Sequence, residues 1–354
     1  MRKYYTRACN FYYGTNARNL IKKKLALSLC GNKNIAFDNI EILSRDRKAK
    51  LHHIKNIKTL PYKIKRIVLT DIIKITSKKK NLNKYINIVD PLIMGVLNLT
   101  PDSFSDGGLY NESKKAFSHI RNMISSGADI IDIGGESTRP GSKNMSDKKE
   151  WKRLKIVISN FKKKFPKTFL SIDTRKSDIM LRAIKYKSDL INDVSGFNYD
   201  SKAINRIKKY NVWKVLHHMQ GSPNTMQIKP NYKNVLLDIY DYFVERIKYA
   251  RFSGVKHNNI IIDPGIGFGK NLKHNITLIS KISLFHSLGF PVLLGMSRKK
   301  FIKDISGKND SKQRLGGTIG SALFSLMQGV QILRVHDVNE VIQSIKIFKE
   351  LLKS

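Results

Sequence analysis

Met94-Gly-Val-Leu-Asn-Leu-Thr-Pro-Asp-Ser-Phe-Ser-Asp-Gly-Gly108 is the stretch of sequence that decides the fold. An apolar run from Leu92 to Leu97 stops at Asn98, a loop rich in Pro, Asp, Ser and Gly follows, and a helical pattern begins near Ser113. This order is typical of a buried strand that carries a polar side chain and a loop to one edge of a sheet, with a helix behind it.

The same alternation of strand and helix repeats along the chain from Pro91 onward. The apolar runs predict strands at 92–97, 129–133, 169–172, 189–191, 213–216, 260–262, 291–294 and 331–335. Helical patterns follow them at 113–126, 147–164, 177–185, 201–209, 235–252, 275–288, 311–328 and 338–352. Eight units in roughly 260 residues predict an α/β protein with a (β/α)8 (TIM) barrel. An open doubly wound sheet is the alternative, but it usually has a Gly-rich first turn, which is missing here.

The charge distribution separates an N-terminal extension from this repeating part. Residues 1–90 carry 22 Lys and Arg against 5 Asp and Glu, and no acidic residue precedes Asp38. We therefore expect a small basic extension over residues 1–88, of uncertain structure, and a barrel domain over 89–354. Within the extension, 34–43 is a candidate strand and 17–29 a candidate basic helix. A small accessory subdomain, a partly disordered arm and an organellar transit segment all remain open.

Composition restricts the class of protein further. No apolar run approaches the ~20 residues that span a bilayer, and the N-terminus lacks the apolar segment of a secretion signal. The two cysteines, Cys9 and Cys30, give little support to a disulfide framework or a zinc site. We expect a cytoplasmic protein without a membrane partner. The formal net charge of +39 is spread over every kind of segment and comes without a nucleic-acid motif, so no nucleic-acid partner is expected.

Polar residues follow every predicted strand, where a barrel has its active site. Acceptors come from Asp173, Asn192 and Asp263, and Lys299 supplies a cation. These groups suit the paired donors and the carbonyl of a heterocycle. Met219 and Phe268 are candidates for the apolar walls of the site. Its anion-binding end would be formed by Arg139, Arg298, Arg334 and His336.

Eight motifs at these positions resemble those of the dihydropteroate synthases. They are MGVLNLTPDSFSDGG, DIIDIGGESTRPG, SIDT, IND, HMQG, DPGIGFGKN, GMSRK and RVHDV, and the resemblance covers roughly residues 91–350. It implies condensation of 6-hydroxymethyl-7,8-dihydropterin diphosphate with 4-aminobenzoate, which gives 7,8-dihydropteroate and pyrophosphate. It also implies small-molecule substrates, a sulfonamide target and a homodimer.

The resemblance also implies a role for each matching residue. Asp173, Asn192, Asp263 and Lys299 would hold the pterin, with Met219 and Phe268 lining its pocket, and Arg334 and His336 would face the pyrophosphate. Asn98 would ligate Mg²⁺. Phe104 and Asp106 would reach inward from a loop that closes over the site. Thr138, Arg139 and Pro140 would shape the aminobenzoate site, with Ser297 binding anionic oxygens. Asn98, Asp106, Lys299, Arg334 and His336 are the expected catalytic residues.

The implied chemistry needs no enzyme nucleophile. Departure of pyrophosphate leaves a stabilised cation, and the arylamine attacks it once water is excluded. One position departs from the family pattern, since Lys300 stands where Ser is frequent. This places the affinity for 4-aminobenzoate and for sulfonamides in doubt.

Several residues have simpler interpretations. His217 and His218 are adjacent strand residues that point to opposite faces, so a shared metal is not expected. Gly265 to Lys270 lacks the first Gly and the final Ser or Thr of a phosphate-binding loop. Structural hydrogen bonding is at least as good an interpretation of Glu136 and Asp193. Two rival functions stay open at this point: a pterin-binding methyltransferase, and a basic nucleic-acid-binding protein on a degenerate barrel.

Overall fold

Eight parallel strands form the central barrel of the computed structural model, which describes residues 3–100, 109–137, 141–142 and 144–353. The hydrogen-bonded order is β10-β9-β8-β7-β6-β5-β12-β11, and a bridge between Ile262 and Val292 closes the ring. The strands are β5 (Leu92–Asn98), β6 (Ile130–Gly134), β7 (Phe169–Asp173), β8 (Leu190–Asp193), β9 (Trp213–His217), β10 (Ile260–Asp263), β11 (Leu293–Gly295) and β12 (Ile332–Val335). The predicted (β/α)8 barrel is confirmed.

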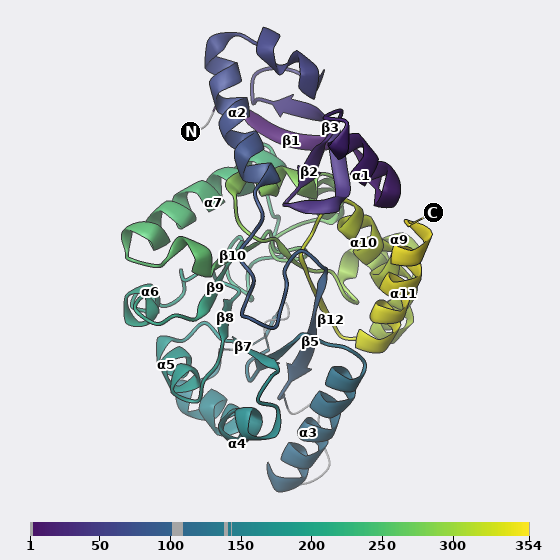
Figure 1. Ribbon diagram of the computed structural model, residues 1–354. Coiled ribbons are helices and arrows are strands. Elements are labelled where there is room, and N and C mark those ends of the chain that lie inside the picture. Colours follow the sequence, from purple (N-terminus) through teal and green to yellow (C-terminus); the bar gives the residue numbers. More distant parts are fainter. Residues whose placement is uncertain (1–2, 101–108, 138–140, 143, 354) are drawn as a thin grey trace.

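Helices surround the barrel because the strands bury side chains on both faces (Figure 1). They are α3 (Leu109–Ser125), α4 (Asp147–Lys164), α5 (Ser177–Lys185), α6 (Ala203–Ile207), α7 (Val235–Phe252), α8 (Leu272–Ser280), α9 (Lys300–Ser306), α10 (Leu315–Met327) and α11 (Val338–Leu351). The short 3-10 segments η3 (His257–Asn259), η4 (Ile282–Leu288) and η5 (Ser311–Arg314) complete this part. Polar residues cap the N-termini of several of these helices. Asn234 caps α7, because its side chain accepts a hydrogen bond from the Leu237 amide. No helix in the described part of the chain is long and apolar enough to cross a membrane.

The segment before β5 fills the barrel at the opposite end from the strand exits. Leu82, Ile86 and Ile88 pack with the first residues of the strands in one apolar cluster. The indole Nε1 of Trp213 donates to the Leu82 carbonyl at 3.0 Å. Figure 1 shows this segment crossing the middle of the ring. We call residues 82–88 the plug.

The N-terminal residues form an antiparallel sheet with two helices, which we call the N-terminal module. Its elements are β1 (Tyr5–Tyr13), α1 (Gly14–Lys22), β2 (Leu27–Leu29), β3 (Asn32–Leu43), β4 (Lys50–His53), η1 (Ile54–Thr59) and α2 (Tyr62–Thr76). The strand expected at 34–43 is part of β3. The helix expected over 17–29 ends earlier, because Lys24 adopts a left-handed φ of 57° and Leu27 then pairs with Phe37.

The module packs against α7 and η4 on one side of the barrel (Figure 1). Tyr5 is fully buried and its ring meets that of Tyr240 edge-on, with centroids 5.1 Å apart. The Tyr5 hydroxyl donates to the Asp241 carboxylate at 2.9 Å. Arg45 pairs with Asp241 at 2.8 Å and with Asp238 at 2.6 Å. An aromatic contact and a shared ion network therefore fix the module to the barrel.

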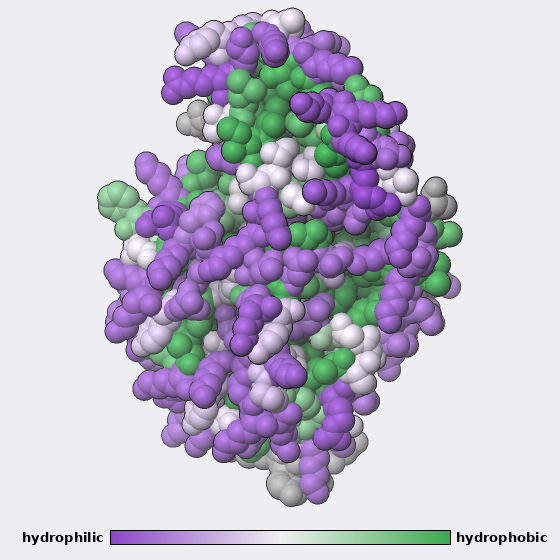
Figure 2. All heavy atoms as spheres, in the orientation of Figure 1, coloured by the Kyte–Doolittle hydropathy of each residue, from purple (hydrophilic) through white to green (hydrophobic). Residues whose placement is uncertain are grey.

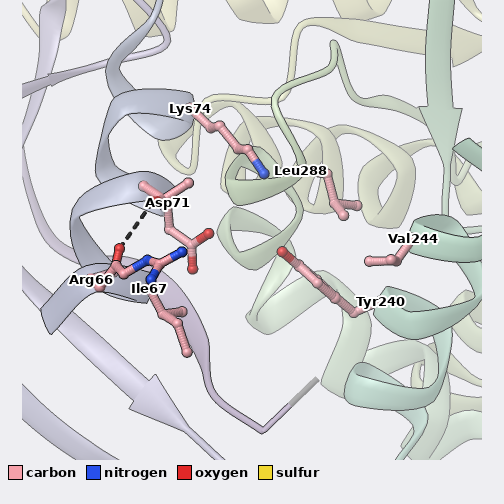
Figure 3. A pocket seen from close by; sticks show the side chains of 8 residues that line it. Arg66, Ile67, Asp71, Lys74, Tyr240, Val244 and Leu288 are labelled. Atoms are coloured by element: carbon pink, nitrogen blue, oxygen red, sulfur yellow. Dashed lines mark hydrogen bonds between the residues drawn. The ribbon is translucent and has the colours of Figure 1, made fainter. Parts of the chain in front are cut away.

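A hollow of about 360 Å³ opens along the seam between α2 and α7 (Figure 3). It is lined by Arg66, Ile67, Thr70, Asp71, Lys74, Tyr240, Val244 and Leu288. These residues belong to α2, α7 and η4, and none lies at a strand end. Figure 2 shows that hydrophilic residues cover most of the face of the molecule seen in Figure 1, with an apolar area over the N-terminal module.

Candidate active site

Parallel pairing brings the carboxyl ends of the strands to one face of the barrel. The register aligns Asn98 with Gly134, Gly134 with Asp173, and Asp173 with Asn192. On the other side of the ring, Asp263 is level with His217, and Arg334 is level with Gly295. The polar residues expected at the exits therefore gather around a single opening.

Arg334, which is half-buried, is the centre of a charge network with two buried carboxylates at this opening. Its Nε donates to Asp132 Oδ2 at 2.7 Å and its Nη2 to Asp173 Oδ2 at 2.9 Å. Asn192 Nδ2 donates to the same Asp132 oxygen at 3.2 Å. Sequence reasoning missed Asp132. Its one signal was a charged residue inside the otherwise apolar strand segment 130–133.

Burial shifts the ionisable groups of this network. The pKa of Asp173 is raised to about 7 by burial, although Arg334 opposes the shift. Burial acts to lower the pKa of Arg334, but Asp132 and Asp173 outweigh it and the pKa is raised. Arg334 therefore stays charged, and the buried carboxyl group of Asp173 beside it takes up a proton more readily than an exposed aspartate does.

Asn192 has one side-chain atom without a partner. The residue is 2% exposed, and its Oδ1 has no hydrogen-bond partner among the described residues. An unsatisfied buried acceptor costs about 1–3 kcal/mol. This oxygen is therefore suited to receive a donor from a bound molecule.

Asp263 and Lys299, which follow the exits of β10 and β11, are close enough to interact electrostatically. Asp263 Oδ1 accepts from the Gly265 amide at 2.7 Å, and burial raises the pKa of this carboxyl group to about 6. Burial lowers the pKa of Lys299 to about 8, with Asp263 opposing that shift. Lys299 donates to the Ile266 carbonyl, and its Nζ lies 4.4 Å from the centroid of the Phe268 ring.

The loop after β10 has a backbone that favours glycine beside Lys299. Gly267 has a φ of 82°, and a Cβ at this position would lie 3.1 Å from Lys299 Cδ. A side chain at residue 267 would therefore strain the backbone and push on the lysine.

The adjacent histidines at the exit of β9, His217 in the strand and His218 directly after it, have separate partners. The His217 ring packs edge-on against Phe268, with centroids 4.7 Å apart. His218 Nδ1 lies 2.9 Å from Nζ of the buried Lys270, which also donates to the Phe268 carbonyl at 2.9 Å. Burial holds the pKa values of His218 and Lys270 well below their usual ranges. The contacts of Lys270 with His218 and with the Phe268 carbonyl therefore fix the loop that carries Phe268.

Ser297 and His336 come together at the exits of β11 and β12. Ser297 Oγ accepts from the His336 amide at 3.2 Å and lies 3.0 Å from His336 Nδ1. Arg298, expected at the anion-binding end, forms an ion pair with Asp337 instead, with Nε donating to Oδ2 at 2.9 Å. Arg298 has a left-handed φ of 60°, so its backbone is held in a conformation that few residues adopt.

The remaining predicted residues lie at the rim or outside the described part of the chain. Asn98 and Met219 are half-buried at the exits of β5 and β9. Phe104, Asp106, Thr138, Arg139 and Pro140 lie outside the described residues. Within the described part, no group of three or more His, Cys, Asp or Glu could hold a metal ion.

Comparison with known proteins places this site in a class. The family model described as "Pterin binding enzyme" matches residues 94–336. The dihydropteroate synthase of Escherichia coli (strain K12) is 38% identical over 269 residues, which cover 76% of this chain and 94% of that protein. The dihydropteroate synthase of Bacillus subtilis (strain 168) is 39% identical over 261 residues, which cover 74% of this chain and 88% of that protein.

Solved structures agree with these relatives. The Yersinia pestis dihydropteroate synthase in a sulfonamide drug complex has a TM-score of 0.72 at 38% identity and covers 76% of this chain and 97% of its own. The Xanthomonas albilineans dihydropteroate synthase with 4-aminobenzoic acid has a TM-score of 0.71 at 34% identity and covers 76% of this chain and 96% of its own.

The fold and the strand-end site are those of a pterin-binding barrel enzyme. Within that class, the chain belongs to the dihydropteroate synthase family, whose members are transferases. The resemblance seen in the sequence is confirmed. The methyltransferase and degenerate-barrel alternatives are set aside, because full-length synthases match the chain.

Proposed function

We propose that the strand-end opening binds a dihydropterin diphosphate and joins it to 4-aminobenzoate, with release of pyrophosphate. The unpartnered Oδ1 of Asn192 carries this proposal, because the amino and ring N–H groups of a pterin supply the donors that this buried oxygen lacks. Asp263 offers two further acceptor sites, and Lys299 faces them with a positive charge. The pterin therefore lies between the acceptors and Lys299, with the Phe268 ring as a wall.

The anionic part of the substrate belongs at the exits of β11 and β12. The Arg334 guanidinium stays charged, and the imidazole of His336, two residues further along the chain, has its Nδ1 3.0 Å from Ser297 Oγ. These groups stabilise the negative charge that develops on the departing pyrophosphate. No side-chain nucleophile is needed, because the electron-rich pterin ring stabilises the exocyclic cation until the arylamine attacks it.

The chain fits a bound Mg²⁺ with a single protein ligand. Magnesium usually takes one or two protein ligands, together with phosphate oxygens and waters. Asn98 presents an amide at the exit of β5, level with Gly134, which has no side chain to block it. Asn98 would hold the ion, and the ion would supply charge neutralisation for the diphosphate. Asp106, Phe104, Thr138, Arg139 and Pro140 keep the roles that the resemblance assigns to them.

A homodimer in the cytoplasm, without a nucleic-acid partner, completes the proposal. Helix α10 supports the dimer, because it leaves Phe324 46% exposed, and a Cβ added at Gly316 or Gly320 would meet nothing within 4 Å. Sedimentation at micromolar concentration tests this state, and a monomer would contradict it.

A direct assay tests the reaction. Purified protein, Mg²⁺, 6-hydroxymethyl-7,8-dihydropterin diphosphate and labelled 4-aminobenzoate are combined, and labelled dihydropteroate is measured for the wild type and for Asp263→Ala. We expect product from the wild type and a loss of at least about a hundredfold in kcat/KM for the variant. A folded wild type that makes no product would reject the proposal.

A further inference from the structure

A pocket of about 180 Å³ lies at the amino end of the barrel, away from the strand exits. It is lined by the first residues of β9 and β10, by residues of η3, by 288–291, and by residues from the segment 73–80. That segment holds the end of α2 and the linker to the plug, so we call this cavity the linker pocket. Lys74 and Leu288 line both the linker pocket and the hollow between α2 and α7 (Figure 3). The proposed chemistry does not use the linker pocket.

The charged residues that line the linker pocket are basic. Four of them are lysines, namely Lys74, Lys78, Lys79 and Lys80. Among the described residues, no Asp or Glu lines the pocket. Like charges repel one another, and the repulsion grows where water is partly excluded. An anion in the pocket would therefore remove an unfavourable interaction between the lysines.

Lys79 carries this positive charge into the interior. The residue is 5% exposed, and its Nζ donates to the Lys74 carbonyl at 2.6 Å, its one hydrogen-bond acceptor among the described residues. An ammonium group has three N–H donors, so two donors remain for other partners. Lysines are rarely buried unless they are paired with an opposite charge. Burial of Lys79 beside a pocket without carboxylates therefore indicates an anionic ligand.

His257 lies in the same positive field. Burial and the charges of Arg251, Lys79 and Lys74 all act to lower the pKa of His257. Its ring packs against Phe290, with centroids 4.4 Å apart, so the imidazole is held at the wall of the pocket. An anion bound beside this ring would act in the opposite direction and raise the pKa.

The size of the linker pocket restricts the ligand. Its volume of about 180 Å³ is below the about 300–1,000 Å³ of pockets that take drug-sized ligands. Lys78 and Lys80 are exposed, whereas Lys79 is buried, so cations lie both at the surface and at the inner end. The stem of Lys74 lies against Gly289, where an added Cβ would be 3.5 Å from Lys74 Cγ. These features fit a small anion with several charged oxygens.

We propose that the linker pocket binds a small phosphate anion, with Lys79 at its inner end and Lys74, Lys78 and Lys80 around it. Inorganic phosphate and pyrophosphate share this chemistry, because lysine binds phosphate oxygens as a compact point charge. The pocket lies at the opposite end of the barrel from the strand exits, so the inference does not depend on the proposed reaction. A bound anion neutralises the lysines between α2 and the plug, and so stabilises the contact of the N-terminal module with the barrel.

Titration calorimetry of the full chain tests the inference, with pyrophosphate in one series and inorganic phosphate in another, at about 0.15 M salt. Pyrophosphate should bind more tightly, because it carries more negative charge. Lys79→Met should weaken the binding of pyrophosphate at this site by about tenfold or more, since it removes a hydrogen bond between charged groups. The variant should fold, because methionine fills similar space without a buried charge. Pyrophosphate bound at the strand exits would contribute equally to both proteins.

Lys65→Met is the matched control. Lys65 also belongs to α2, and its Nζ donates to the Lys58 carbonyl at 3.2 Å, as Lys79 donates to that of Lys74, but Lys65 does not line the pocket. This variant should bind pyrophosphate as the wild type does. NMR of the histidine rings locates the ligand, with His257→Gln to assign the signal. Pyrophosphate should raise the pKa of His257 in the wild type.

Three results would overturn the inference. Equal weakening in Lys65→Met and Lys79→Met would show that the charge of the N-terminal module attracts the anion, and not the linker pocket. Equal binding by Lys79→Met and the wild type, or an unchanged pKa of His257, would place the anion elsewhere. A single-stranded oligonucleotide that binds more tightly than pyrophosphate, and loses affinity in Lys79→Met, would assign the lysines to nucleic acid.

Discussion

Asp263 and Lys299 share one buried environment, and burial moves their pKa values toward each other. The carboxyl group titrates at about 6 and the ammonium at about 8. Both groups are therefore charged together over a narrow range near neutral pH. The proposed role of this pair in binding the pterin therefore predicts that kcat/KM depends on pH.

The value of kcat/KM for the dihydropterin diphosphate should follow a bell-shaped pH profile. It should fall below about pH 6 as Asp263 gains a proton, and above about pH 8 as Lys299 loses one. Initial rates at saturating 4-aminobenzoate measure the profile. Lys299→Arg keeps its charge at high pH, so it should flatten the alkaline limb alone. A profile unchanged from about pH 5 to about pH 9 would contradict the assignment.

Asp263→Asn should stabilise the fold while it weakens binding. The folded pKa of about 6 lies above the ordinary value of 3.8, so the folded state holds its proton more tightly than the unfolded state. Stability is therefore lost as the pH rises from about 4 to about 6, and the cost is fully present above that range. Asparagine removes this cost, which is on the order of 1–3 kcal/mol.

Thermal unfolding of the wild type and Asp263→Asn at two pH values measures this effect. The variant should unfold at a higher temperature at pH 7.5, and the difference should shrink at about pH 4. A lower unfolding temperature for the variant at pH 7.5 would show that the carboxylate stabilises the fold.

Residues at the strand ends could be predicted from the sequence, because the end of an apolar run marks the exit of a strand. Asp173, Asn192, Asp263 and Arg334 were found in this way. The pairing of Arg334 with Asp132 could not be found, because the two residues are separated by 202 positions and meet only when the barrel closes. The ion pair between Arg298 and Asp337 could not be predicted for the same reason, because the two residues are distant in the sequence and meet only in the folded barrel.

At the scale of elements, the Arg298–Asp337 ion pair joins the loop after β11 to the loop after β12. Ser297 precedes the arginine and His336 precedes the aspartate, so the pair fixes the contact between Ser297 and His336. Arg298→Met should raise the KM for the dihydropterin diphosphate by about tenfold. The affinity of this variant for hydroxymethylpterin, which lacks the diphosphate, should equal that of the wild type. Titration calorimetry measures both affinities.

Lys349→Met is the control for this change, because Lys349 forms an exposed ion pair with Asp90. Exposed ion pairs contribute little to stability, so Lys349→Met should change neither the KM for the dihydropterin diphosphate nor the affinity for hydroxymethylpterin. If Arg298→Met weakens the binding of hydroxymethylpterin as much as the binding of the dihydropterin diphosphate, the ion pair shapes the whole opening and not only its anionic end.

The barrel elements were predictable because their patterns are local. The bounds of α4, α5 and α7 match the periodicity to the residue. The helix expected at 275–288 is interrupted at Lys281, whose φ of −123° ends α8 before η4 begins. Strand β1 escaped prediction because its buried residues occupy adjacent positions, Tyr5 with Thr6 and Ala8 with Cys9, so it lacks the alternation of a half-exposed strand.

At the scale of the whole molecule, the N-terminal module and the barrel share one core. Tyr5 lies in the same apolar cluster as Tyr240 and Phe285 of the barrel. Tyr5→Ala should therefore lower the free energy of unfolding by about 3–5 kcal/mol, as for other large buried aromatic residues. Tyr62→Ala should change it by less than about 0.5 kcal/mol, because Tyr62 is 73% exposed on the same module.

Chemical denaturation of both variants, followed by a barrel signal such as Trp213 fluorescence, measures these values. A single transition that moves for Tyr5→Ala would show that module and barrel unfold together. Two separate transitions, of which only one moves, would show that the seam does not couple them.

The plug imposes an order of events on biogenesis. Residues 82–88 leave the ribosome before any strand of the barrel whose base they fill, and Trp213 follows more than a hundred residues later. Translation adds about 5–20 residues per second, so the three apolar side chains of the plug lack their barrel partners for several seconds. Nascent chains therefore expose an apolar segment during elongation, and chaperones that bind exposed apolar segments should bind the nascent protein at residues 82–88.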